Sequence, residues 1–209
     1  MKRALWLGSL SVLLALQGCE LALIGAGGAA AVTAFDRRTS SAIYQDESMA
    51  LTIRDRISGR FGNLTHVNVA PYNRMILLTG EAPDEQTRAA IEADVRGIAN
   101  LRGIVNDIQI APVSSLAGRT NDSFITSKIK GRFLDSGKVN PVHVRVVTEA
   151  GVVYLLGLVT EAEANDAVEI ARTTGGVRKV VKVFDYCQPT DEICRPQAKP
   201  PAENPKPAA

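Results

Sequence analysis

The sequence of 209 residues contains few of the residues that usually carry catalysis or cross a membrane. It has two histidines and three cysteines, and aromatic residues make up 5% of it. Its first apolar run, Ala4 to Leu16, spans roughly 20 Å as a helix, which is too short for a stable transmembrane segment. The rest of the composition, 45% hydrophobic and 22% charged, is that of a globular protein and excludes collagen-like, coiled-coil and wholly disordered chains.

An excess of one charge sign is also missing. Lys2 and Arg3 lie in a segment that we expect to be removed, and without them 22 basic residues face 22 acidic residues. A chain so close to neutrality has no global field that would attract nucleic acid. We therefore expect no nucleic-acid partner, and any electrostatic partner must be held by a local patch.

The N-terminus indicates export from the cytoplasm. Two basic residues precede the apolar run, as in a signal peptide, which we place at residues 1–18. The run ends in Leu16-Gln17-Gly18-Cys19, which resembles a bacterial lipobox, where the cysteine is acylated before cleavage. Lipid on Cys19 would then be the strong anchor, and we expect no other cofactor. The alternative is a plain secretory signal followed by a chance cysteine.

The two remaining cysteines, Cys187 and Cys194, form an even pair near the C-terminus. In an oxidising periplasm a small disulfide loop is favoured over a metal site, because two thiolates alone do not complete a tetrahedral zinc shell. We expect residues 19–45 to form a membrane-proximal tether. Residues 187–209 should form the Cys loop and a Pro-rich tail, disordered from Gln188 onward.

Between these ends the sequence repeats itself at an offset of 76 or 77 residues. For example, His66-Val67-Asn68-Val69 aligns with His143-Val144-Arg145-Val146. We place a first repeat at 46–111, a linker at 112–120 and a second repeat at 121–186. Each repeat reads as helix, strand, strand, helix, strand. The sequence therefore predicts an α+β fold with two tandem units, each a three-stranded mixed sheet covered on one face by two helices.

This pattern resembles the BON domain. The resemblance rests on isoleucines four apart in the first helix, the Val-x-Val strand, and Leu-Thr-Gly or Leu-Leu-Gly ending the second strand. With the lipobox, it extends to the dual-BON outer-membrane lipoproteins of Gram-negative bacteria. That resemblance implies binding of anionic phospholipid through the first helix of the second repeat, a role in envelope integrity, and enrichment at division sites. A Trp important for the lipid contact in that family falls at Phe124 here.

Nothing in the sequence argues for an enzyme, and we expect no catalytic residues. His66 and His143 occupy equivalent positions in different repeats, and we expect no Cys/His/Asp cluster around either. We interpret both as half-exposed strand residues and expect no metal site. Ser114-Ser115 lacks the context of a catalytic serine, and the acidic residues near Asp84 and Glu161 suit helix starts.

The helix expected over residues 123–136 is the most informative segment. Ile125, Ile129 and Phe133 share one stripe, whereas Phe124 and Leu134 each lie about 140° away from its centre. The outward strip is completed by two small and two basic residues, Ser127, Gly131, Lys128 and Lys130. In the first repeat the aligned positions hold polar residues, with Ser48, Asp55 and Ser58 in place of Phe124, Gly131 and Leu134.

This strip suits a helix that dips into a bilayer surface, with apolar side chains in the acyl boundary and lysines at anionic headgroups. The sequence and the resemblance together predict binding of phosphatidylglycerol and cardiolipin through Phe124 and its neighbours. An alternative is that Phe124 and Leu134 pack against the first repeat or the linker, or dock a protein such as an outer-membrane assembly component. A third class, a hydrolase or ligand carrier, requires a deep pocket with convergent polar groups.

Overall fold

The computed structural model describes residues 36–194. From Arg37 onward these residues belong to one compact unit, which is described below. The predicted signal peptide, the lipidation site Cys19 and the end of the tail, 195–209, lie outside the described residues. None of the helices between residues 36 and 194 is both long enough and apolar enough to cross a bilayer.

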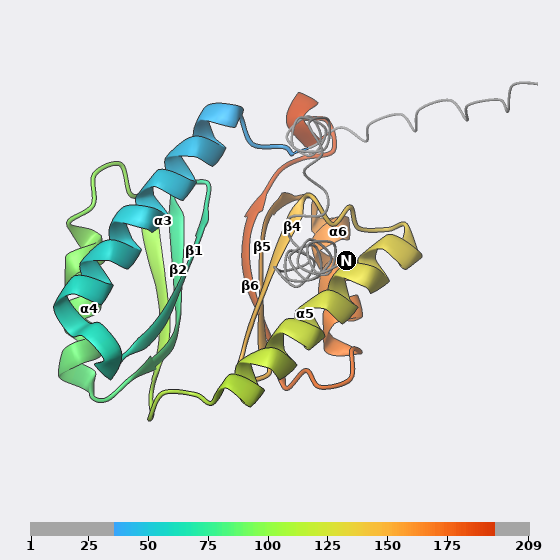
Figure 1. Ribbon diagram of the computed structural model, residues 1–209. Helices are drawn as coiled ribbons and strands as arrows, with labels where there is room; N and C mark the ends of the chain where they lie inside the picture. Colours follow the sequence, from blue (N-terminus) through green and yellow to red (C-terminus); the bar gives the residue numbers. More distant parts are fainter. Residues whose placement is uncertain (1–35, 195–209) are drawn as a thin grey trace, which may run out of the picture. The chain divides into compact units, whose positions relative to one another are not determined.

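The first repeat has the predicted order of elements (Figure 1). They are α3 (Ser40–Phe61), η1 (Gly62–Leu64), β1 (His66–Tyr72), β2 (Met75–Ala82), α4 (Glu85–Arg96) and β3 (Gly103–Ile110). β2 is the central strand, antiparallel to β1 and parallel to β3. The two long helices cover one face of this sheet.

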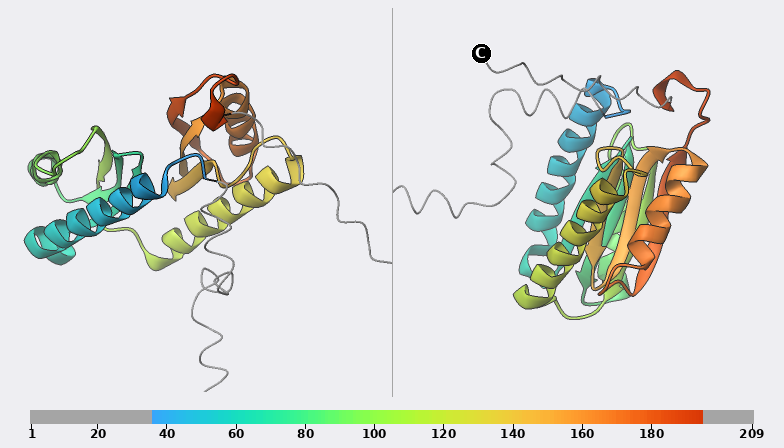
Figure 2. Two further views of the ribbon diagram at one scale, coloured as in Figure 1. Left: turned by 90° about the horizontal axis from the view of Figure 1, so that it is seen from above. Right: turned by 90° about the vertical axis from the view of Figure 1, so that its right-hand side faces the viewer.

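The second repeat is built in the same way (Figure 2). Its elements are α5 (Leu116–Ser136), β4 (Val144–Glu149), β5 (Val152–Val159), α6 (Glu161–Arg172), β6 (Lys179–Tyr186) and η2 (Glu192–Cys194). β5 lies between antiparallel β4 and parallel β6. The predicted α+β architecture with two three-stranded mixed sheets is therefore confirmed.

Each sheet packs one face against its own helices and the other against the second sheet. In the first repeat Ile53 and Ile57 of α3 lie in a core with Ile76 and Leu78 of β2. A further buried cluster joins the opposite faces of both sheets, with side chains from β1, β2 and β5: Ala70, Tyr72, Leu77, Tyr154 and Leu156. Burial of both faces explains why β2 and β5 are almost continuously apolar.

Both hairpins are held by an aspartate from the preceding helix. Asp46, fully buried in α3, accepts hydrogen bonds from the backbone N–H groups of Asn73 and Arg74, each at 2.7 Å. Asp122 of α5 does the same for Ala150 and Gly151 at 2.9 Å. All four turn residues have positive φ, and the carboxylates stabilise that strained conformation by satisfying its donors.

The helices begin earlier than predicted at both boundaries. α3 starts at Ser40 because the Thr39 side chain caps it, so residues 40–45 are helix and not tether. α5 starts at Leu116, capped by Ser115, so much of the expected linker 112–120 is helical. The first turns of α3 and α5 have no strong apolar periodicity. A polar capping residue alone is too weak a signal to locate the start of a helix from the sequence.

The second repeat also extends further toward the C-terminus than predicted. Cys187 and Cys194 are joined by a disulfide, and Cys194 is buried. The Cys187 backbone N–H donates to the Val159 carbonyl at 3.1 Å, which extends the edge of the sheet beyond β6. The expectation of disorder from Gln188 is therefore wrong for residues 188–194, because the loop is closed at both ends and packs on the second repeat.

Candidate functional site on helix α5

The outward strip of α5 lies as its helical spacing predicts. Ile125, Ile129 and Phe133 are almost fully buried, whereas Phe124 and Leu134 are 61% and 67% exposed. These exposures exclude the alternative in which Phe124 and Leu134 pack against the first repeat within residues 36–194. Together with Leu116, which is 78% exposed at the start of α5, three large apolar side chains of this helix are thus left in contact with water.

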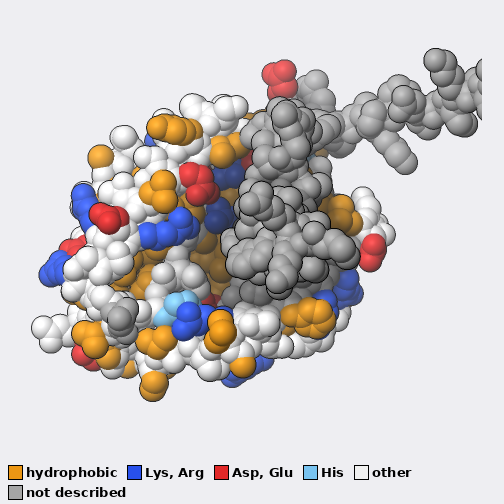
Figure 3. Space-filling view, viewed as in Figure 1, with side chains coloured by type: hydrophobic (Ala, Val, Ile, Leu, Met, Phe, Trp, Pro, Cys, Tyr) orange, Lys and Arg blue, Asp and Glu red, His pale blue; other side chains and the backbone are white. Residues whose placement is uncertain are grey.

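The two lysines of the strip differ in their surroundings. Lys128 donates from Nζ to the Gly175 carbonyl at 2.6 Å, and Nζ lies 4.9 Å from the centroid of the Phe124 ring. Lys128 therefore positions the ring and brings positive charge to it by a cation–π contact. Lys130 is exposed. On the face of the molecule drawn in Figure 3, hydrophobic and basic side chains lie next to one another.

The small residues of the strip leave its surface open. Ser127 is exposed, and its hydroxyl donates to the Ser123 carbonyl within the helix. A Cβ added at Gly131 would meet no atom within 4 Å. Glycine is thus not needed here for packing, although it lowers the intrinsic stability of a helix. Its presence lets a flat surface approach the helix between Phe124 and Leu134.

Helix α3 has exposed apolar residues that the sequence comparison missed. Tyr44 is 76% and Leu51 63% exposed. Tyr44 lies in the range expected to form the tether. Leu51 aligns with Ser127, and this pair is not among the three aligned pairs considered in the sequence. The aligned replacements at 48, 55 and 58 remain polar, so the two helices expose apolar residues at different positions. Only α5 combines them with a net positive charge, since α3 has as many acidic as basic residues.

The two histidines have closer partners than expected. His66 begins β1, and its Nδ1 lies 3.1 Å from Oε2 of Glu81 on the neighbouring strand. A second buried carboxylate, Glu149 of the second repeat, lies beside them, and these three residues are grouped closely enough to hold a metal ion. The expectation of no surrounding cluster is wrong, because Glu149 arrives from the other sheet. Burial raises the pKa of Glu149, which the Asn68 hydrogen bond opposes.

His143 precedes β4 and belongs to a different network. Its Nδ1 lies 3.9 Å from Glu163, which forms two hydrogen bonds of 2.7 and 2.9 Å with Arg37. Burial alone would raise the pKa of Glu163, but hydrogen bonds from His143, Arg37 and the Thr160 backbone hold it well below its usual range. Arg37 also donates to the Leu158 carbonyl, so this N-terminal residue is part of the second repeat.

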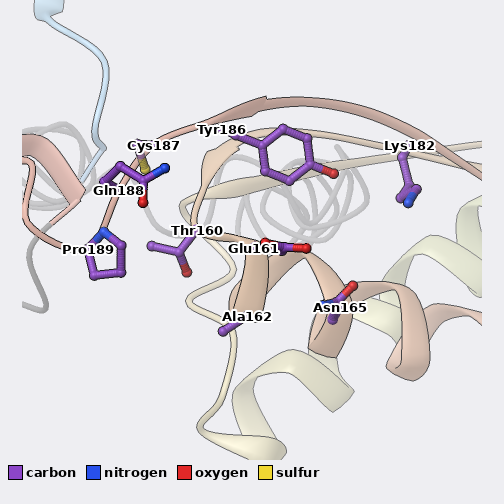
Figure 4. Close-up of a pocket in the computed structure, with 9 residues that line it drawn as sticks. All are labelled: Thr160, Glu161, Ala162, Asn165, Lys182, Tyr186, Cys187, Gln188 and Pro189. Atoms are coloured by element: carbon purple, nitrogen blue, oxygen red, sulfur yellow. The ribbon is translucent and has the colours of Figure 1, made fainter.

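A hollow of about 500 Å³ lies between α6, β6 and the Cys loop (Figure 4). Glu161 and Asn165 of α6 and Lys182 and Tyr186 of β6 line it. Its lining contains no histidine, and the hydroxyl of Thr160 is engaged in capping α6. The hollow has the size of a ligand pocket but lacks a nucleophile paired with a general base, so it does not favour a hydrolase.

Comparison with known proteins agrees with this architecture. The outer membrane lipoprotein DolP of Haemophilus influenzae is 34% identical over 173 residues, covering 82% of this chain and 90% of that protein. A 21 kDa hemolysin of Actinobacillus pleuropneumoniae is 31% identical, covering 73% of this chain and 80% of its own length. Osmotically-inducible protein Y of Escherichia coli is 28% identical, covering 67% and 69%.

The family model of the BON domain matches residues 49–112 and 121–188. These two ranges coincide with the two repeats that the structure shows, each with its own sheet and helix pair. The chain belongs to the BON-domain family.

Proposed function

We propose that this protein is a non-enzymatic, lipid-anchored envelope protein whose second BON domain binds anionic phospholipid through α5. The observation that carries the proposal is the exposure of Phe124 and Leu134 on either side of an unobstructed Gly131. Insertion of these side chains into the acyl boundary would remove apolar surface from water.

The charge of the helix supports an anionic surface as the partner. α5 carries four basic residues against two acidic residues, a net charge of +2. Each cation near an anionic membrane contributes about 1 kcal/mol of attraction. Phosphatidylglycerol and cardiolipin supply the required negative charge, whereas a zwitterionic lipid does not.

The anchor and location follow from the N-terminal motif and the relatives. The lipobox-like Cys19 and the similarity to an outer membrane lipoprotein support anchoring at the periplasmic face of the outer membrane. A role in envelope integrity, with enrichment at division sites where anionic lipid is concentrated, follows from the resemblance noted above. Loss of the Cys19 thiol in Cys19→Ser should release the protein from the membrane fraction.

Vesicle sedimentation tests the lipid site. Phe124→Glu should abolish binding of the protein to vesicles that contain phosphatidylglycerol, and salt should weaken binding of the unchanged protein. Leu51→Glu on α3 is the matched control, since Leu51 is 63% exposed, close to the 61% of Phe124. Equal binding by both variants, insensitive to salt, would reject α5 as the site.

The second candidate is an interaction module in which the same strip docks an outer-membrane assembly protein. Its supporting observation is the same pair of exposed apolar residues, which suits a protein interface as well as a bilayer. Partners lost from a pull-down in Phe124→Glu, without vesicle binding by the purified protein, would favour this candidate over lipid binding.

A further inference from the structure

We propose that His66, Glu81 and Glu149 form a binding site for one divalent transition-metal ion, with Zn²⁺ as the best fit, at the junction of the two BON domains. The candidate ligand atoms of these side chains all lie within 4.8 Å of one another. His66 and Glu81 face each other across β1 and β2, and Glu149 stands at the end of β4. The site therefore needs both domains.

The geometry is close to that of a zinc centre. With zinc bonds of about 2.0–2.2 Å to nitrogen and oxygen, the ligands of a tetrahedral site lie roughly 3.3–3.5 Å apart. The pair His66 Nδ1 and Glu81 Oε2 is already at 3.1 Å. No separation among the three ligand atoms exceeds 4.8 Å, so side-chain rotation could complete a three-ligand set with an open position for water.

The cluster places two buried carboxylates beside one imidazole. Glu81 and Glu149 are each 6% exposed. Between residues 36 and 194, no Lys or Arg forms an ion pair with either carboxylate. Glu81 Oε2 accepts a hydrogen bond from the Ser114 backbone N–H at 3.1 Å and contacts His66, and the donor to Glu149 is the uncharged Asn68 at 2.5 Å. Burying two carboxylates beside one imidazole is unfavourable without a cation. A divalent ion would supply the missing positive charge.

A neighbouring polar group also lacks a partner. Thr79 lies two residues before Glu81 on the same face of β2, and it pairs in register with Asn68. Its side chain is 1% exposed, and among the described residues its Oγ1 has no hydrogen-bond partner. A buried hydroxyl near the cluster without a protein partner could accept or donate a hydrogen bond to a water bound to the metal ion.

The second BON domain shows that the fold does not require these acids. By strand register, His143 corresponds to His66, Leu158 to Glu81 and Tyr72 to Glu149. At that corner the Leu158 N–H donates to the Tyr72 hydroxyl at 3.0 Å, and Arg37 pairs with the nearby Glu163. The equivalent positions are thus satisfied by neutral groups and an arginine, whereas the His66 corner carries two carboxylates.

Zinc titration of the full chain in detergent, after treatment with a chelator, tests the proposal. Calorimetry should show one saturable Zn²⁺ per chain, and zinc should raise the melting temperature because it joins the two domains. His66→Gln and Glu149→Gln should each weaken binding by more than about tenfold. His143→Gln, at the equivalent position of the second domain, should bind Zn²⁺ as the unchanged protein does.

Because His66→Gln and Glu149→Gln remove different ligands, the test remains decisive if one of them folds poorly. The melting temperature of each variant without zinc reports whether it is folded. Absence of saturable binding would overturn the proposal and leave the cluster as a hydrogen-bonded junction between the two domains. Equal binding by His66→Gln and His143→Gln would overturn it too, because zinc would then be held elsewhere.

Discussion

The two BON domains share a backbone plan but differ in what they expose on their first helices. α5 presents Phe124 and Leu134 around an open glycine, whereas α3 places Ser48, Ser58 and Asp55 at the aligned positions. The buried stripes of the two helices are equivalent, with isoleucines four residues apart in both. Equal cores with unequal surfaces indicate that the fold fixes the buried positions of the first helix and leaves its outward positions free to differ between the two domains.

The N-terminal ends of α4 and α6, the second helix of each domain, also differ. α4 is capped by Asp84 alone, whereas α6 has a full capping box in which Thr160 and Glu163 bond reciprocally. Glu163 additionally binds Arg37, so the second domain uses one carboxylate to stabilise a helix and to hold the N-terminal segment. Thr87 occupies the corresponding position of α4 and forms no such link.

The largest expected effect concerns the cluster between the sheets. Leu156→Ala should lower the free energy of unfolding by about 2–5 kcal/mol, because Leu156 is fully buried there. Since Leu77 and Tyr72 of the first domain share that cluster, amide exchange should speed up in α3 as well as in α5. Denaturant unfolding and hydrogen exchange measure both quantities.

Leu51→Ala provides the control for this substitution, because the same change at a 63% exposed site should alter stability by no more than about 0.5 kcal/mol. Unchanged exchange in α3 of Leu156→Ala would mean that the two domains unfold independently, against the shared cluster.

A smaller effect on stability is expected at the start of α6, where Arg37 binds Glu163, and it should exceed the effect at the start of α4. Arg37→Gln should lower the free energy of unfolding by about 1–3 kcal/mol at pH 7, because the almost fully buried Arg37 pairs with Glu163, whose side chain is 22% exposed. The folded pKa of Glu163 lies below its ordinary value near 4.5, so its contribution is present above that pH and lost as the pH falls. The difference between the two proteins should shrink below about pH 4.5.

The first domain again supplies the control. Arg88 pairs with Glu85 at the start of α4, but both side chains are exposed, so Arg88→Gln should change stability by less than about 1 kcal/mol. Thermal unfolding of both variants between pH 3 and pH 7 makes the comparison. A loss in Arg37→Gln that stays constant across this range would contradict a role for the ionised Glu163.

The elements and the α5 strip could be predicted because they depend on local periodicity. Isoleucines four apart define the buried stripe, and residues 140° away from it must face outward. Contacts between distant segments could not be predicted in this way. Glu149 reaches His66 only because two sheets pack face to face, and Arg37 reaches Glu163 across 126 residues of sequence.

The hairpin aspartates were missed for a related reason. Asp46 and Asp122 recur at the repeat offset, which was a usable signal, but each stands in a helix where an acidic residue normally faces solvent. Their role depends on the positive φ angles of turn residues 27 to 29 positions later. Recurrence of a charged residue at an apolar-facing position would have indicated burial.

The smallest effect sharpens the comparison of α3 and α5 at one position. Gly131→Asp introduces the residue that α3 has there and should weaken binding to phosphatidylglycerol vesicles about fivefold, which corresponds to about 1 kcal/mol for one charge near the surface. The helix should remain folded, since the space around Gly131 is open and aspartate forms helices at least as well as glycine. Gly131→Ala, measured by the same vesicle sedimentation, should bind as the unchanged protein does. Equal binding by Gly131→Asp would show that the membrane does not approach this face of α5.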